Sequence, residues 1–523
     1  MYYPQLQTVA DTVAFHAARQ PDQVAIICED RHISYGALHA ESNRVARALC
    51  AAGFARGARV GYLGKESEHY YEIFFACAKS ETVLVPINWR LTASEIDHIL
   101  RDSGTEILFV EHELLPTALE AQTTLPRLRL VVDLDGTGAI GSGLRAWTAG
   151  QPAGHVVPAT GSDDPIVQLY TSGTTGLPKG VVLAQRSFFK IRDGLAGQGL
   201  DWLDWQPGDV SLIGIPGFHV AGIWWAMQGF SAGVPNVSLR TFRSKDALRA
   251  IRELRVTTTL VVPAMLHMLL GEPRLGPDDF ASLRKVAYGG SPISESLLRQ
   301  CLDVLGCELT QLYGLTESGN AAVCLPPRDH VIGSPLLRAA GRPLPGVQVQ
   351  VVDASGASIA PGMVGEICIR TPAVMIEYWG LPGVTADTLV DGWLRTGDAG
   401  TLDAEGYLFI SDRIKDTVIV AGENVYPAEV ENALCKHPAV AEAAVIGVPD
   451  ERWGEAVRAF VALRAGFDAT PRQLMLFLKG NIADFKIPTR YDFVPSVPRN
   501  PSGKVLRRVL RDACWAHMER HVN

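Results

Sequence analysis

Hydrophobic and polar positions follow two alternating rhythms along the first 110 residues. Short, continuous apolar runs predict buried strands, and apolar residues at three- and four-residue spacing predict amphipathic helices between them. The expected strands are residues 24–28, 59–63, 83–87 and 106–110. The expected helices are residues 35–52, 66–79 and 92–103. This alternation predicts parallel sheets covered by helices.

Two predicted helices begin with a capping box, in which a hydroxyl residue precedes Glu or Gln by three positions. Thr92 and Glu95 form one such pair. Thr470 and Gln473 form the other, with Pro471 at the first helical position, where its missing N–H does no harm. Both pairs therefore predict where a helix starts.

The segment from Val210 to Leu239 contains no Asp, Glu, Lys or Arg, a pattern that also occurs in membrane-spanning helices. Pro216, Pro235 and several glycines interrupt it and divide it into pieces too short to cross a bilayer. A buried strand, loop and helix of an α/β core is the better interpretation.

After about residue 340 the pattern changes to short strands separated by turns rich in Gly, Pro and Asp. We expect a small β-rich subdomain at about 340–412, followed by a compact mixture of helices and strands. The predicted fold class is α/β. An N-terminal domain (1–412) would hold parallel-rich sheets covered by helices, and a small α+β C-terminal domain (413–523) would follow it.

Composition narrows the classes of protein that fit. A chain of 523 residues with 47% apolar and 20% charged residues is typical of a globular protein of two or more domains. A net charge of −8 argues against non-specific binding to nucleic acid or anionic membranes. The cysteines are scattered and the N-terminus has no export signal, so we expect a cytoplasmic protein with reduced thiols. The oligomeric state stays open, and a homodimer is compatible with these features.

The residues richest in chemistry are 170–180, which read Tyr-Thr-Ser-Gly-Thr-Thr-Gly-Leu-Pro-Lys-Gly. Hydroxyls, bare backbone N–H groups and a mobile ammonium are the donors that phosphate oxygens accept. The segment follows a strand-like run at 165–169, but it is not a Walker loop, because Lys179 is followed by Gly180 and no hydroxyl residue. Taken alone, such a loop is more often a solvated connector.

Further motifs appear in order along the chain. They are Pro-Gly-Phe-His-Val-Ala-Gly at 216–222, Tyr-Gly-Gly-Ser-Pro at 288–292, Tyr-Gly-Leu-Thr-Glu at 313–317, Trp-Leu-Arg-Thr-Gly-Asp at 393–398, Asp-Arg-Ile-Lys-Asp at 412–416 with Ala-Gly-Glu-Asn-Val-Tyr-Pro at 421–427, and Pro-Arg-Asn-Pro-Ser-Gly-Lys at 498–504. Together with the phosphate loop they resemble the adenylate-forming superfamily of acyl- and aryl-CoA synthetases, firefly luciferase and peptide-synthetase adenylation domains. The resemblance extends over nearly the whole chain.

The resemblance implies a two-step reaction. A carboxylate attacks the α-phosphate of ATP in complex with Mg²⁺, which gives an acyl-adenylate and pyrophosphate. A thiol, usually that of coenzyme A as co-substrate, then displaces AMP.

The resemblance also implies a role for each matching residue. The phosphate loop would hold the β- and γ-phosphates through Thr171, Ser172, Gly173, Thr174, Thr175, Gly176 and Lys179. The adenine would lie against Gly289, Gly290, Ser291, Tyr313 and Gly314, with the Tyr313 ring stacked on the base. The remaining ATP contacts would be Thr316 with the α-phosphate, Glu317 with magnesium, and Asp398 and Arg413 with the ribose.

Two further residues would act on the acid itself. Lys504 would bridge the substrate carboxylate and the α-phosphate, where two anions must approach each other. His219 would border the acyl pocket as a structural gate and not as a general base. Taken singly, each is ordinary, Lys504 as a solvated lysine and His219 as a core residue. The ordered set of motifs outweighs those interpretations.

In the family the C-terminal domain is mobile and rotates between the two half-reactions. Lys415 or Asp416 would be the hinge. Rotation would withdraw Lys504 and bring in the loop Gly422, Glu423 and Asn424 to line the thiol tunnel. Trp453 and Lys486 would contact coenzyme A.

The apolar segment narrows the class of acid. An enzyme for amino acids needs an acidic partner for the substrate ammonium, and residues 211–235 contain no Asp or Glu, so a fatty or aromatic acid fits better. The Gly-Glu-Asn-Val-Tyr-Pro motif at 422–427 resembles medium- and long-chain fatty-acyl-CoA synthetases and aryl-CoA ligases about equally; we favour an acyl-CoA synthetase for a medium- or long-chain fatty acid, with an aryl- or cinnamoyl-type CoA ligase as the alternative. Two other classes remain, an adenylating enzyme that loads an acyl carrier protein and a non-catalytic nucleotide-binding relative.

Two departures from the family pattern are small: Gln185 and Arg186 replace a hydroxyl residue and His, and Asp412 replaces the commoner Gly.

Overall fold

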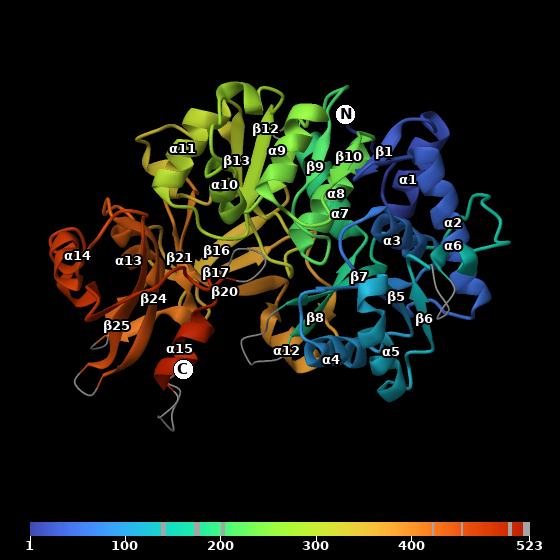
Figure 1. Cartoon of the computed structure of the whole chain (residues 1–523). Coiled ribbons are helices and arrows are strands. Elements are labelled where there is room, and N and C mark those ends of the chain that lie inside the picture. The colour runs from blue at the N-terminus through green and yellow to red at the C-terminus, as the bar shows by residue number, and fades with distance from the viewer. Residues whose placement is uncertain are drawn as a thin grey trace.

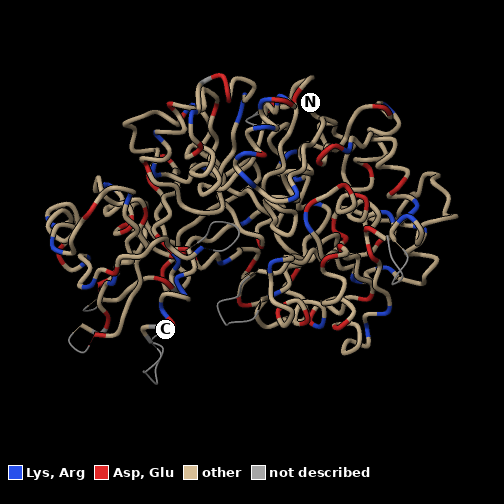
Figure 2. The backbone as a smooth tube through the Cα atoms, viewed as in Figure 1, with Lys and Arg blue, Asp and Glu red and all other residues tan. Residues whose placement is uncertain are grey.

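The computed structural model describes residues 1–136, 143–171, 178–199, 204–420, 423–450, 453–499 and 505–515. Figure 1 shows a large N-terminal part with a smaller C-terminal part, coloured orange to red, beside it. Acidic and basic residues are intermixed over both parts (Figure 2). None of the helices in these described ranges is long and apolar enough to cross a membrane.

The first sheet of the N-terminal part has nine strands in the order β15-β14-β13-β12-β11-β9-β10-β1-β2. The six strands from β13 to β1 are parallel, and antiparallel strands close both edges. The strands are β1 (Val24–Cys28), β2 (Arg31–Ser34), β9 (Ser211–Ile213), β10 (Asn236–Ser238), β11 (Thr258–Val261), β12 (Lys285–Gly289), β13 (Glu308–Tyr313), β14 (Val323–Leu325) and β15 (Arg342–Pro343).

The second sheet has seven strands in the order β18-β8-β7-β4-β3-β5-β6. The five strands from β7 to β6 are parallel, while β8 and β18 are antiparallel to their neighbours. The strands are β3 (Arg59–Leu63), β4 (Val83–Ile87), β5 (Ile107–Val110), β6 (Leu130–Asp133), β7 (Pro165–Thr171), β8 (Lys179–Ala184) and β18 (Glu377–Tyr378).

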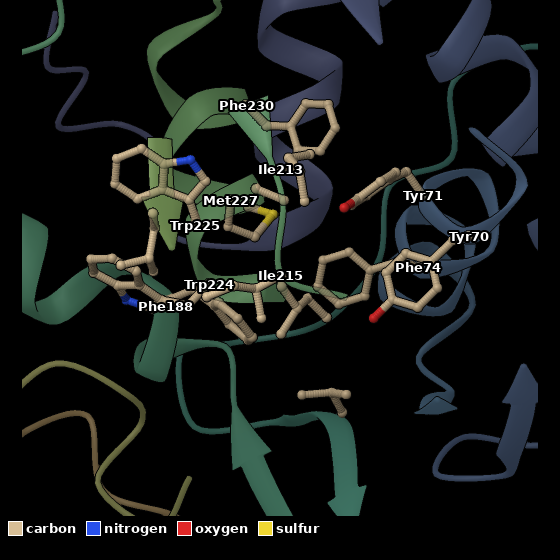
Figure 3. Packing of buried hydrophobic residues seen from close by; sticks show 14 of the residues in the cluster. Tyr70, Tyr71, Phe74, Phe188, Ile213, Ile215, Trp224, Trp225, Met227 and Phe230 are labelled. Carbon is tan, nitrogen blue, oxygen red and sulfur yellow. The ribbon is translucent and has the colours of Figure 1, made fainter. Parts of the chain in front are cut away.

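Helices cover both sheets, and two of them pack into the core between the sheets. The helices are α1 (Val9–Arg19), α2 (Tyr35–Ala51), α3 (Glu68–Ser80), α4 (Ala93–Ser103), α5 (Leu115–Thr124), α6 (Leu144–Trp147), α7 (Arg186–Gly197), α8 (Val220–Ala232), α9 (Ser244–Glu253), α10 (Pro263–Leu270), α11 (Glu295–Leu305) and α12 (Pro382–Thr388). Helices α3 and α8 are buried on nearly every face: α8 has no charged residue, and α3 buries Glu68, Glu72 and Lys79 among its aromatic side chains. Figure 3 shows their aromatic residues packed together with Ile213 and Ile215.

A five-stranded antiparallel sheet forms the β-rich subdomain. Its strands are β16 (Gln348–Val352), β17 (Gly365–Arg370), β19 (Leu389–Val390), β20 (Trp393–Leu402) and β21 (Leu408–Arg413). Figure 1 places β16, β17, β20 and β21 between the first sheet and the C-terminal part.

The C-terminal part has its own sheet and its own hydrophobic core, which is built from residues between Val418 and Leu478. Its strands are β22 (Val418–Val420), β23 (Glu423–Val425), β24 (Val440–Asp450), β25 (Gly454–Leu463) and β26 (Arg490–Phe493). Its helices are α13 (Pro427–Leu434), α14 (Pro471–Leu478) and α15 (Arg507–Trp515). Short 3₁₀ turns complete the chain at His112–Leu114, Pro277–Phe280, Pro327–Asp329, Pro335–Arg338, Ile414–Asp416 and Asp484–Lys486.

The local signals of the sequence are confirmed where capping and burial decide the structure. Thr92 and Thr470 cap α4 and α14, and each forms the predicted reciprocal box. The charge-free segment folds as strand β9, helix α8 and strand β10, as expected. One helix starts later than predicted: α3 begins at Glu68, because Ser67 has extended backbone. Glu66 therefore lies in the loop before the helix, a position that matters below.

Candidate active site

The candidate site lies at one edge of the first sheet. Strands β9, β11, β12 and β13 are parallel, so the loops after them emerge at the same edge. Those loops carry His219 after β9, Gly290 and Ser291 after β12, and Thr316 and Glu317 after β13. The carboxyl edge of a parallel sheet is the usual place for a ligand in such folds.

Two glycines leave the backbone without side chains at the end of β12. A Cβ on Gly289 would lie 2.2 Å from the carbonyl oxygen of Leu312 on β13, so the strand approach requires glycine. Gly290 has a φ of +80°, which side-chain residues rarely adopt. Half-buried Ser291 follows. This backbone without side chains lies next to β13, the strand that ends at Tyr313, where the adenine is predicted to bind.

Tyr313 is joined to the two predicted ribose residues. Its hydroxyl donates to Oδ2 of Asp398 at 2.7 Å, and Nε of Arg413 lies 2.9 Å from Oδ1 of the same carboxylate. Asp398 on β20 and Arg413 on β21 are register partners in the β-rich sheet. Burial, and then the charge of Asp398, raises the pKa of Tyr313 well above its ordinary value, so its hydroxyl remains a donor. The structure therefore brings these three predicted residues together.

A tight turn presents Thr316 and Glu317. A Cβ on Gly314 would lie 1.5 Å from the carbonyl oxygen of Asn320, so only glycine permits this turn. The Ser318 hydroxyl accepts from the Leu315 N–H and donates within the same turn. The motif at 313–317 therefore ends in a tight loop.

Tyr378 links Glu317 to the phosphate loop, and sequence reasoning missed it. Its hydroxyl donates to Oε1 of Glu317 at 2.8 Å, and Nζ of Lys179 lies 4.8 Å from the centre of its ring. The residue is placed there by β18, which pairs with β8 so that Tyr378 lies opposite Val181. No periodicity or motif marks Tyr378 in the sequence, because the pairing joins strands nearly 200 positions apart.

The phosphate loop connects two antiparallel strands. Thr171 ends β7, Lys179 begins β8, and the two residues are register partners. The motif is therefore the connection of a β-hairpin, and not a strand-to-helix loop of the Walker kind. Ser172, Gly173, Thr174, Thr175 and Gly176 lie outside the described residues.

His219 is the N-cap of α8 and packs against Phe218, with ring centres 4.7 Å apart and the rings tilted by 58°. Its Nε2 is enclosed and has no hydrogen-bond partner within the described structure. Burial, and then the charge of Arg90, lowers the pKa of His219 to about 4, so the ring is neutral at physiological pH. An enclosed neutral ring fits a wall of a pocket, as the sequence expectation had it.

The residues predicted for the C-terminal part are placed only in part. Glu423 and Asn424 are exposed on β23, and Trp453 is 43% exposed at the start of β25. The Lys486 ammonium lies 2.8 Å from both carboxylate oxygens of Glu429. The Lys415 backbone lies in the 3₁₀ turn Ile414–Asp416. The Lys415 side chain, Gly422 and Lys504 lie outside the described residues.

The chain on each side of Lys504 is anchored to the C-terminal part. Upstream, Nη2 of Arg499 lies 3.0 Å from Oε2 of Glu442. Downstream, Nη2 of Arg507 lies 2.8 Å from both oxygens of Glu431. Nη1 of Arg507 also lies 3.8 Å from Oδ1 of Asp412, next to the predicted hinge. Both described flanks, Arg499 and Arg507, are therefore attached to residues of the C-terminal part.

Comparison with known proteins agrees with this geometry. Residues 13–379 match the family described as AMP-binding enzyme, and residues 429–504 match the AMP-binding enzyme C-terminal domain. The chain belongs to the AMP-binding, adenylate-forming enzymes.

Among characterised members, fatty acid–[acyl-carrier-protein] ligase ScoC of Streptomyces coeruleorubidus is 58% identical over 100% of this chain and 99% of its own. Indoleacetate–CoA ligase of Aromatoleum aromaticum is 36% identical over 95% of this chain and 96% of its own. The solved structure of ATP-bound MatB from Rhodopseudomonas palustris has a TM-score of 0.88 at 30% identity, covering 98% of this chain and 100% of that one. This adenylate-forming enzyme is thus a ligase that activates a carboxylic acid with ATP.

The donors at the site would fit a magnesium ion bound together with ATP. Mg²⁺ takes one or two carboxylates together with phosphate oxygens and water. Over the described ranges there is no cluster of three or more His, Cys, Asp or Glu side chains that could hold a metal by itself. Glu317 has one oxygen held by Tyr378, and its other oxygen could take the cation. The ion would supply charge neutralisation at the phosphates.

Replacing Glu317 with glutamine is expected to raise the Mg²⁺ concentration needed for half-maximal acyl-adenylate formation, because an amide oxygen carries no full charge. Pyrophosphate exchange measured across a magnesium titration tests this. The matched control is Glu377→Gln, which changes the neighbouring residue of Tyr378 on β18. A Glu317→Gln titration curve identical to that of the control would exclude Glu317 as the ligand.

Proposed function

We propose that the chain is a fatty acid–[acyl-carrier-protein] ligase. It would convert a medium- or long-chain fatty acid to an acyl-adenylate and then transfer the acyl group to the phosphopantetheine thiol of a carrier protein. The observation that carries this proposal is the 58% identity with ScoC over practically the full length of both chains. Two enzymes that are 58% identical share their acceptor thiol and their class of acid more often than two enzymes that are 36% identical, as this chain and indoleacetate–CoA ligase are.

The interior next to the site supports an apolar acid. Helix α8, which begins at His219, contains no charged residue, and its Trp224 and Trp225 are buried. An acyl chain held beside such a helix is desolvated without leaving a charge unpaired. An amino acid would bring an ammonium to a wall that offers it no carboxylate.

The proposed first step forms a bond between a carboxylate oxygen of the acid and the α-phosphorus of ATP. The bond from that phosphorus to the oxygen that bridges it to the β-phosphate breaks, and pyrophosphate leaves. Lys179, held over Tyr378, would neutralise the leaving phosphates. Lys504 would neutralise the two anions as they meet. Asp398 and Arg413, tied to Tyr313, would hold the nucleoside in place.

The proposed second step replaces oxygen with sulfur. A thiolate attacks the acyl carbon, the bond from carbon to the phosphate oxygen breaks, and AMP leaves. Opening access for the thiol would require the C-terminal domain (413–523) to rotate against the N-terminal domain (1–412), with the hinge at Lys415 or Asp416. Glu423 and Asn424, exposed on β23, would then line the thiol path.

The identity of the thiol is where the proposal departs from the first expectation. The motifs alone favoured coenzyme A. Coenzyme A and a holo carrier protein present the same phosphopantetheine arm, so the tunnel cannot separate them. They differ beyond that arm, where coenzyme A carries a phosphorylated nucleotide. Lys486, expected to contact it, is paired with Glu429.

The test is a screen of short, medium, long and aromatic acids for pyrophosphate release. Each acid is assayed with coenzyme A, with a bacterial holo acyl carrier protein, and with the apo form of that carrier protein as the matched control. We expect medium or long fatty acids to be activated and the acyl group to appear on the holo protein by mass spectrometry. Thioester formation only with coenzyme A would contradict the proposed acceptor, and activation only of aromatic acids would contradict the proposed acid.

A further inference from the structure

A buried carboxylate holds the backbone of the turn that leads to His219. Glu66, in the loop before α3, is 5% exposed. Its Oε2 accepts the backbone N–H of Gly217 at 2.8 Å, and its Oε1 accepts the hydroxyl of Tyr71. The two residues joined by the Glu66–Gly217 contact are 151 positions apart in sequence.

The carbonyl of the same glycine is held as well. The hydroxyl of Tyr70 donates to the Gly217 oxygen at 2.8 Å. A Cβ on Gly217 would lie 2.5 Å from Cζ of Tyr70, so the ring packs directly on the bare backbone. The backbone N–H and carbonyl of Gly217 are therefore both satisfied by side chains, one from the loop before α3 and one from α3 itself, as a buried backbone requires.

Ring packing fixes the positions of the two tyrosines that make these contacts. The Tyr71 ring lies 5.1 Å from the ring of Phe230 on α8, and the Tyr70 ring lies 5.1 Å from that of Tyr62 on β3. Figure 3 shows Tyr70 and Tyr71 entering the core beside Ile215 and Phe230. The contacts of Glu66, Tyr70 and Tyr71 around Gly217 thus form a clamp, which packs against helix α8 and strand β3.

Gly217, which these side chains hold, lies two residues before His219, the predicted gate of the acyl pocket. The N–H of His219 donates to the carbonyl of Pro216 at 3.0 Å, so Gly217 lies inside the turn that sets the ring's position. A Cβ on Gly222 would lie 2.3 Å from the carbonyl oxygens of Ile215 and Pro216, so α8 packs tightly against the same turn. The turn has little freedom while Gly217 is held.

We propose that Glu66 is a positioning residue for acid binding, which fixes the Gly217–His219 turn and so the wall of the acyl pocket. This rests on the proposed function, in which His219 borders that pocket. Glu66 acts through the turn and does not touch the reacting atoms.

What the turn needs from Glu66 is an acceptor, not a charge. Burial raises the pKa of the Glu66 carboxyl to about 7, while the Tyr71 hydroxyl and the Gly217 N–H oppose that rise. A glutamine at this position can accept from Gly217 through its amide oxygen and donate to the Tyr71 oxygen. A leucine fills the volume but leaves the Gly217 N–H buried without a partner, which is costly.

The test compares Glu66→Leu with Glu66→Gln in pyrophosphate exchange, using the acid that the wild type activates best. For Glu66→Leu we expect the KM for the acid to rise on the order of tenfold, the size of a lost buried hydrogen bond, with kcat and the KM for ATP nearly unchanged. Glu66→Gln should return the acid KM close to that of the wild type. The matched control is Glu68→Leu, which removes a carboxylate that is 3% exposed and bonded to Arg31, away from the turn.

Hydrogen exchange of the peptide containing Gly217 gives a readout that needs no substrate. Exchange should be faster in Glu66→Leu than in Glu66→Gln or Glu68→Leu. The proposal is overturned if Glu68→Leu raises the acid KM as much as Glu66→Leu, if Glu66→Gln fails to rescue, or if the Gly217 amide exchanges alike in all variants. A wild type that activates no fatty acid would contradict the proposed function alone, since the exchange experiment still tests the clamp.

Discussion

Replacing Lys504 with alanine is expected to slow acyl-adenylate formation by about a hundredfold or more, the scale of removing one preorganised charge donor from an active site. The carboxylate and the α-phosphate are both anions, and their repulsion grows as the new bond forms. A cation placed between them stabilises the transition state more than the separated reactants. The effect should appear in kcat of pyrophosphate exchange.

The second half-reaction separates this role from a general loss of structure. Thioester formation from pre-made acyl-adenylate should survive Lys504→Ala, because the lysine would be withdrawn by then. Lys479→Ala, an exposed lysine at the end of α14, serves as the matched control and should leave both steps unchanged. Equal loss of both half-reactions in Lys504→Ala would refute the rotation account.

Replacing Arg507 with alanine is expected to destabilise the C-terminal part by about 3–5 kcal/mol, the cost of stranding buried carboxylates without their cation. The guanidinium holds Glu431 at 2.8 Å and lies 3.8 Å from Asp412 and 4.0 Å from Asp416. Burial raises the pKa of Glu431 and of Asp412, and Arg507 opposes the rise in each. Without the arginine those pKa values would rise further.

The pH dependence of that loss follows from the sign of the shifts. A carboxyl with a raised folded pKa is stable in the core while protonated and costs free energy once pH exceeds its unfolded pKa. The deficit of Arg507→Ala should therefore be larger at pH 8 than at pH 5 in urea unfolding. Arg508→Ala is the matched control, because Arg508 makes an exposed pair with Asp512 worth about 0–1 kcal/mol. A deficit no greater than that of Arg508→Ala would contradict the prediction.

Arg507 also bears on catalysis through the chain that carries Lys504. With Arg499 bound to Glu442 and Arg507 bound to Glu431, the intervening loop is attached at both ends to the body that is proposed to rotate. Under the proposed rotation, this attachment would carry Lys504 with the C-terminal part.

Interactions between residues close in sequence explain which parts of the fold could be predicted from the sequence. The capping boxes at Thr92 and Thr470 are interactions within four residues, so the sequence contains both partners. The same holds for Gly314, whose turn closes on Asn320 six positions later. Strands such as β1, β3 and β4 were predicted at their true bounds, because each is a short and mainly apolar run, as buried parallel strands are.

The residues of the site also fall into two groups, those that the sequence predicted and those that it did not. Motifs alone placed Tyr313, Asp398 and Arg413 in one nucleotide site, and the structure confirms that they touch. Tyr378 and Glu66 were missed, because each acts through a partner 61 and 151 positions away. No pattern in the sequence indicates which distant residue a hydroxyl or a carboxyl will contact.

Short, continuous patterns were enough to assign the family and the order of the elements, and the family resemblance supplied the residues predicted to meet ATP. The contacts of Tyr378 with Glu317 and Lys179, of Glu66 with Gly217 before His219, and of Arg507 with Glu431 after Lys504 became visible only in the folded chain. The physical reason is that those contacts are created by strand pairing and helix packing, which bring distant residues within hydrogen-bond reach.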